Sequence, residues 1–160
     1  VNGGGVFVLL SGTPVIHQLR GGMVITFDDG TTREWAVART RSYTLSIAMV
    51  LTVTESGDTL IAGKKVAYWG KNRANDQFWL SIDKQVSTNV FGGALCRLYK
   101  PYEGVVVIAS TVTGTTNSLT ITYGVDVNGN PITGPLDCPY GYKLNWVDGS
   151  GVAQQLIVKY

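Results

Sequence analysis

The chain has 160 residues, of which 44% are hydrophobic and only 15% are charged, against roughly 25% charged residues in typical soluble domains. With 13 Lys and Arg against 11 Asp and Glu, the net charge is +2, which argues against nucleic acid as a partner because phosphate binding needs clustered positive charge. No run approaches the roughly 18 consecutive apolar residues of a membrane helix, so no membrane span is expected.

Hydrophobic residues recur with a period of two along the chain, and Gly, Asn and Asp bound these runs. This pattern predicts strands and indicates an all-β protein. The first clear unit is a strand from Met23 to Phe27, a turn at residues 28–30, and a returning strand through Trp35 and Val37. Asp-Gly suits the turn because Gly takes positive φ without steric cost.

The stretch SYTLSIAMVLTVT, residues 42–54, reads as one strand with two different faces. The apolar face, predicted to be core, carries Tyr43, Leu45, Ile47, Met49, Leu51 and Val53. The second face has no charge, although strands that face water usually carry charged side chains. Its candidate subunit-contact residues are Thr44, Ser46, Val50 and Thr52.

Two placements fit this second face: a solvated, Thr-rich surface, or a face covered by a neighbouring subunit. Thr is common on half-exposed strands, which favours the first placement. The pattern recurs between Ser110 and Thr122, which is also uncharged, and this favours the second, because neighbouring copies in an assembly cover such faces.

Aromatic residues flank a polar loop between Tyr68 and Trp79. The candidate contact residues are Trp69, Lys71, Asn72, Arg73, Asn75, Asp76 and Trp79. Such a mixture can stack on a sugar ring or form a protein-contact hot spot, where Trp, Tyr and Arg are enriched. A plain β-hairpin, with aromatic residues meeting across the strands and polar residues solvating the turn, explains the same residues.

The C-terminal half continues in hairpins. Two strands flank residues 114–117, Asn128-Gly129 marks a further turn, and the last pair of strands folds about residues 148–151. At least ten strands without helical spacers predict a single β domain over residues 1–160, a β-sandwich or jelly roll of mostly antiparallel strands.

Catalytic groups are not indicated. His17 is the single histidine and has no assigned partner; a pair with Cys96 is conceivable, but nothing marks a stabilised thiolate. The pattern Asp126-x-Asn128-x-Asn130 resembles the start of a calcium loop but lacks the downstream Glu, and a turn explains it. We therefore expect no enzyme activity, no cofactor and no metal.

Cys96 and Cys138 could form a disulfide or remain two thiols. A bridge would tie the Pro-rich stretch around Cys138 to a strand and would close a loop of about 40 residues, worth about 3–4 kcal/mol in the chain-entropy model.

Low charge, uncharged strand faces and the lack of catalytic motifs favour a non-enzymatic structural subunit. We expect it to pack with copies of itself or with related structural proteins, in a virion, tail, fibre or cell-surface structure. The alternative is a carbohydrate- or receptor-binding module that uses the loop from Tyr68 to Trp79, with a glycan or surface receptor as its partner.

Overall fold

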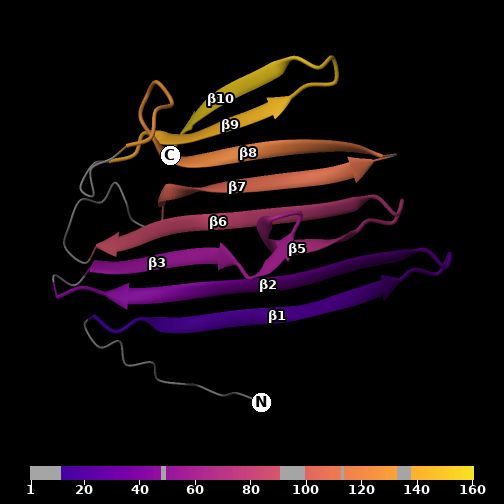
Figure 1. Ribbon diagram of the computed structural model, residues 1–160, viewed down its shortest axis with the longest axis horizontal. Coiled ribbons are helices and arrows are strands. Elements are labelled where there is room, and N and C mark those ends of the chain that lie inside the picture. Colours follow the sequence, from indigo (N-terminus) through magenta and orange to yellow (C-terminus); the bar gives the residue numbers. More distant parts are fainter. Residues whose placement is uncertain (1–11, 48–49, 91–99, 113, 133–137) are drawn as a thin grey trace.

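The computed structural model describes residues 12–47, 50–90, 100–112, 114–132 and 138–160. These residues form ten strands and no helix (Figure 1). The strands are β1 (Val15–Thr26), β2 (Thr32–Leu45), β3 (Val50–Gly57), β4 (Thr59–Ile61), β5 (Lys64–Lys71), β6 (Gln77–Val90), β7 (Pro101–Val112), β8 (Thr115–Val125), β9 (Gly141–Val147) and β10 (Ala153–Lys159). The all-β class and the prediction of about ten antiparallel strands are confirmed.

All ten strands belong to one sheet with the order β10-β9-β8-β7-β6-β3-β2-β5-β4, and β1 pairs with β2. Every strand pairing is antiparallel. Strands β3 and β5 share the space between β2 and β6, because each of them pairs with both. A sandwich has two stacked sheets, whereas the described residues form a single one.

Residues 42–54 form a hairpin and not the single strand that the sequence suggests. Strand β2 ends at Leu45 and β3 begins at Val50, with Leu45 opposite Leu51 and Thr44 opposite Thr52. The backbone N–H of Ser46 donates to the carbonyl of Val50 and closes the turn. Because odd residues pair with odd ones, the two predicted faces survive the reversal of the chain.

The predicted core face of this hairpin is not buried. Tyr43, Leu45, Leu51 and Val53 are half-buried, and Ile47 is 93% exposed. Met49, assigned to the same face, lies outside the described residues. The expectation failed because no second layer covers this part of the sheet in the described part of the chain.

A small hairpin interrupts the strand formed by β3 and β5. Arg39 lies opposite Gly57, and Val37 lies opposite Tyr68. Residues 58–67 therefore have no partner on β2 in the register of this ladder. Ala62 and Gly63 form the two-residue turn between β4 and β5, with φ of 49° and 75°. Positive φ at both positions is the pattern of a type I′ hairpin turn.

The core is small and lies near the middle of the sheet. Its buried centre is Ala67, Ile82 and Val106, with Tyr68, Leu80, Ile121 and Tyr123 packed against it. The buried hydrophobic residues of the described chain are Val37, Ala38, Val66, Ala67, Ile82, Val86, Val106, Ala109 and Val125. Most large apolar side chains of the sheet therefore stay in contact with solvent.

Candidate functional site

Strands β6 to β10 share one face without a charged side chain among their described residues. The register aligns Leu80, Ile108, Leu119 and Trp146 in one row, and Ile82, Val106, Ile121, Leu144 and Leu156 in the next. Tyr123, Tyr142 and Val158 continue it. The polar positions on the same face are Gln85, Ser87, Ser110, Asn117 and Gln154. We call this surface the apolar face.

The apolar face is open along its outer strands. Ile108 is 41% exposed and Leu156 is 51% exposed, while Leu119, Leu144 and Trp146 are half-buried. An open groove of about 510 Å³ runs over it, lined by Ile108, Ala109, Ser110, Asn117, Ser118, Leu119, Leu144, Trp146 and Val147. Apolar side chains on these strands of the sheet thus remain in contact with water.

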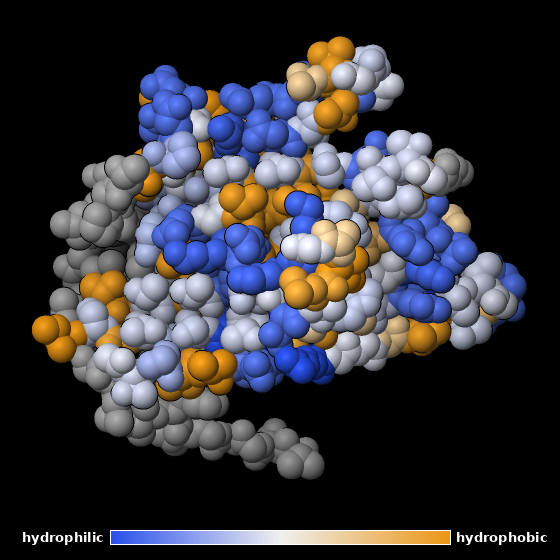
Figure 2. All heavy atoms as spheres, viewed as in Figure 1, coloured by the Kyte–Doolittle hydropathy of each residue, from blue (hydrophilic) through white to orange (hydrophobic). Residues whose placement is uncertain are grey.

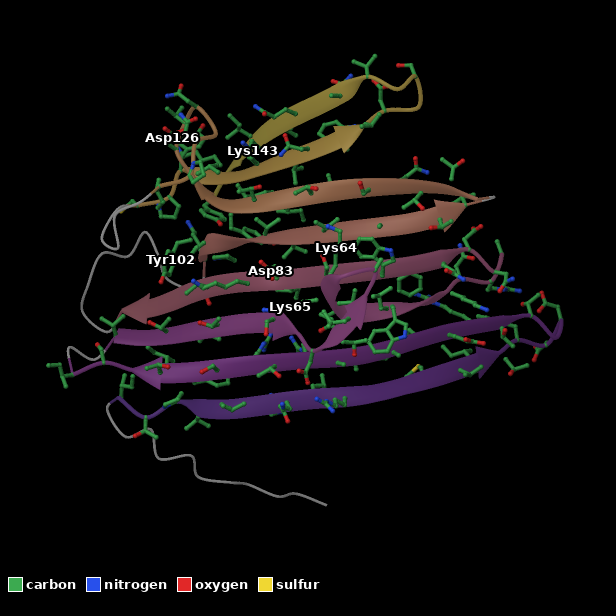
Figure 3. The ribbon with its side chains drawn as sticks, in the orientation of Figure 1. Lys64, Lys65, Asp83, Tyr102, Asp126 and Lys143 are labelled. Atoms are coloured by element: carbon green, nitrogen blue, oxygen red, sulfur yellow. The ribbon has the colours of Figure 1, made fainter. Side chains whose placement is uncertain are left out.

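The opposite face of the same strands carries charge. Lys84 and Glu103 form an ion pair at 2.6 Å, with both side chains about half exposed. Lys65 of the β4–β5 hairpin pairs with Asp83 of β6 at 3.7 Å, and Figure 3 labels both residues near the middle of the sheet. In Figure 2, hydrophilic and hydrophobic residues lie side by side over the middle strands of the face in view. On the apolar side, Ile82 and Val106 are buried at the centre of the sheet, but Ile108 and Leu156 on the outer strands remain exposed.

Aromatic residues close one end of the apolar face. The rings of Tyr123 and Tyr142 lie 5.9 Å apart, those of Tyr142 and Tyr160 lie 5.8 Å apart, and the Tyr160 hydroxyl donates to the carbonyl of Pro101. Burial raises the pKa of the Tyr123 and Tyr160 phenols, so both stay neutral. Lys100 brings a positive charge to this end, with its ammonium 5.4 Å from the centre of the Tyr160 ring.

The face continues towards β2 and β3 into a buried ion-pair cluster. Glu55 is 9% exposed and accepts hydrogen bonds from Nη1 of Arg39 at 2.7 Å and from Nε of Arg41 at 2.6 Å. The Nε of Arg39 is buried and has no hydrogen-bond partner. The two guanidinium groups satisfy the carboxylate, so Glu55 has a structural role here.

The candidate subunit-contact residues lie on the side opposite the apolar face. Thr44 and Thr52 are direct neighbours across the β2–β3 ladder, and the N–H of Val50 donates to Oγ of Ser46 at 3.2 Å. All four residues are half-buried. They share one surface, as the alternation predicts, and their role in assembly stays a prediction.

The candidate contact loop is a tight turn between β5 and β6. Trp69 and Trp79 lie directly opposite each other on these strands, as do Lys71 and Gln77. Asn72 and Asp76 close the turn, because Oδ1 of Asn72 accepts the N–H of Asp76 and Nδ2 of Asn72 donates to Asp76 Oδ2. Asn75 sits at the tip with φ of 65°. Most of the polar groups of this loop therefore build the turn.

Arg73 at the tip of this loop is engaged within the molecule. Its Nη2 lies 2.5 Å from Oδ2 of Asp29, and its Nε donates to Oγ1 of Thr31 at 3.1 Å. The guanidinium also stacks over the ring of Phe27. Arg73 thus joins the β5–β6 turn to the β1–β2 turn, and a ligand would have to compete for these bonds.

The remaining polar candidates have local partners or lie outside the described residues. Oδ1 of Asp126 accepts the N–H groups of Asn128 and Asn130, which is the turn that explains this motif. Among the described residues no group of three or more His, Cys, Asp and Glu could hold a metal. His17 is exposed on β1. Cys138 is disulfide-bonded, and Cys96, the other cysteine of the sequence, lies outside the described residues.

The sequence analysis noted the uncharged stretch from Ser110 to Thr122 but did not identify the apolar face. The available signal was the alternation between Val105 and Tyr123, where neither side carries a charge and one side places Val106, Ile108, Leu119 and Ile121 together. No helix in the described part of the chain has the length and apolarity to cross a membrane. Comparisons with protein-family models, with curated proteins and with solved structures find no match to this chain.

Proposed function

We propose that the protein is a non-enzymatic structural subunit whose sheet is completed by contact with other protein chains. Its partners are copies of itself or related structural proteins, in a virion, tail, fibre or cell-surface structure. The observation that carries this proposal is the apolar face, which is uncharged over β6 to β10 and is open along its outer strands, where Ile108 and Leu156 are 41% and 51% exposed. A sheet with one apolar side is stable when another layer covers that side.

Exposed apolar side chains on the described strands support the same proposal. Ile16, Met23, Val24, Ile108 and Leu156 are all at least 41% exposed, and exposed apolar patches on a protein surface mark interaction sites.

The carbohydrate- or receptor-binding alternative gains less from the geometry. The sequence suggested a binding loop because Arg73 and two Trp residues lie close together in it. In the structure, Arg73 forms hydrogen bonds with Asp29 and Thr31, and the two Trp residues lie opposite each other on β5 and β6. A hairpin turn accounts for these contacts without a ligand.

Thermal unfolding at protein concentrations over two decades tests the proposed function. A subunit that is stabilised by association gains stability by mass action, so its melting temperature should rise with concentration. A melting temperature that does not change with concentration, from a chain that refolds reversibly, would count against assembly.

A further inference from the structure

We propose that the apolar face packs against the same face of a second copy, so that two identical sheets form a β-sandwich across the contact. This inference rests on the proposed function and names its partner and surface. The pairing is isologous, which means that each copy contributes Ile108, Leu119, Trp146 and Leu156 to both sides of the contact.

The lack of charge on the apolar face favours a second copy as the occupant. A face with no charged side chain from β7 to β10 meets its own copy without repulsion between like charges. The opposite side of the same strands carries Lys84, Glu103 and Lys143, and packing a second sheet on it would take these charges out of water. The apolar face can be covered without that cost.

The apolar face is also the kind of surface that packs against a copy of itself. Two sheets stack about 10 Å apart and interdigitate the side chains of their inner faces. Burial in such a contact would move the half-exposed side chains of the apolar face into a core of ordinary density.

Two residues of β7 provide a matched test. Ile108 on the apolar face is 41% exposed, and Val105 on the opposite face is 39% exposed. In the proposed dimer, Ile108→Lys buries an unpaired charge twice, once in each copy, and should raise the dissociation constant at least about 100-fold. Val105→Lys should leave the constant within about threefold. Circular dichroism of both variants checks that the sheet is retained.

Thiol labelling locates the contact directly. A maleimide should label Ile108→Cys slowly in the associated protein and quickly after dilution to the monomer, while Val105→Cys should be labelled at one rate in both states. The unsubstituted chain supplies the background rate. Labelling of Ile108→Cys that stays fast in the associated protein would overturn the inference.

The outcomes separate this inference from the proposed function. If the chain associates but Val50→Lys dissociates it and Ile108→Lys does not, the Thr-bearing face makes the contact, and only the inference fails. If the chain stays monomeric with a freely labelled Ile108→Cys, self-association fails as well. If Ile108→Cys is protected in a monomer, another segment of the same chain covers the apolar face, and the inference is wrong.

Discussion

The guanidinium carbon of Arg73 lies 4.0 Å from the centre of the Phe27 ring. The same side chain pairs with Asp29, so one arginine holds the β1–β2 turn against the β5–β6 turn. From the sequence, Arg73 is a candidate residue for contact with a ligand or partner. The Arg73 side chain is 51% exposed, but its charge forms an intramolecular ion pair with Asp29.

Arg73→Ala should lower the free energy of unfolding by about 1 kcal/mol, because it removes an exposed cation–π contact and a surface ion pair. Arg73→Lys should retain part of this stability, since Lys keeps the charge but not the planar stacking. Urea unfolding measures both variants. If Arg73→Ala is as stable as the unsubstituted protein, the contacts of Arg73 with Phe27 and Asp29 contribute nothing to stability.

Glu55→Gln should destabilise the sheet by about 1–3 kcal/mol, because two half-buried guanidinium groups then lose their counter-charge. Glu103→Gln is the matched control: its partner Lys84 is 54% exposed, and exposed pairs contribute about 0–1 kcal/mol. Chemical denaturation compares the two. A smaller loss for Glu55→Gln than for Glu103→Gln would mean that burial does not strengthen this cluster.

Ala62→Asn should stabilise the β4–β5 hairpin by about 0.5–1 kcal/mol, because Ala62 has φ of 49° and Asn tolerates this region better. Gly63→Ala should have the opposite effect, since φ is 75° there and a Cβ is strained. The melting temperatures of both variants, compared with that of the unsubstituted protein, test these two predictions. A loss of stability in Ala62→Asn would argue against a type I′ turn.

Asp148 should titrate with an unusually low pKa. The Ser150 hydroxyl, the Gln154 amide and the N–H of Val152 donate to its carboxylate and lower the pKa from 3.8 to about 2. A lowered folded-state pKa stabilises the protein above the unfolded pKa, and this contribution is lost as the pH falls from about 4 through 2.

Carboxyl NMR measures this pKa directly, and Gln154→Ala should raise it because one donor is removed. The difference in melting temperature between the unsubstituted protein and Asp148→Asn should also shrink as the pH falls from 4 to 2. An Asp148 pKa near 3.8 would show that the β9–β10 turn does not hold its carboxylate as described.

Much of the strand pattern could be predicted because Asp-Gly and Asn-Gly sequences mark turns for a known conformational reason. The turn after Phe27 and the turn after Val147 are of this kind, and both lie where the sequence places them. The turn after Leu45 was missed, since the sequence Ser-Ile-Ala-Met contains neither Gly, Pro, Asn nor Asp. Apolar turn residues give the same alternation as a continuous strand.

The candidate site was harder to predict than the strands. Alternation identifies which residues share a face, and it does so correctly for Thr44 and Thr52 across a hairpin that was read as one strand. It does not identify what covers that face, because a second sheet of the same chain and a second copy bury apolar residues equally well. The sequence analysis predicted Ile47 to be a core residue on this basis, and it is 93% exposed in the structure.

Sedimentation equilibrium of the purified chain over a dilution series tests assembly most directly, because it measures mass in solution without a label or a surface. We expect a mass of at least twice 17.2 kDa at micromolar concentration, and dissociation on dilution or with Ile108→Lys. A single species of 17.2 kDa at every concentration would contradict this expectation.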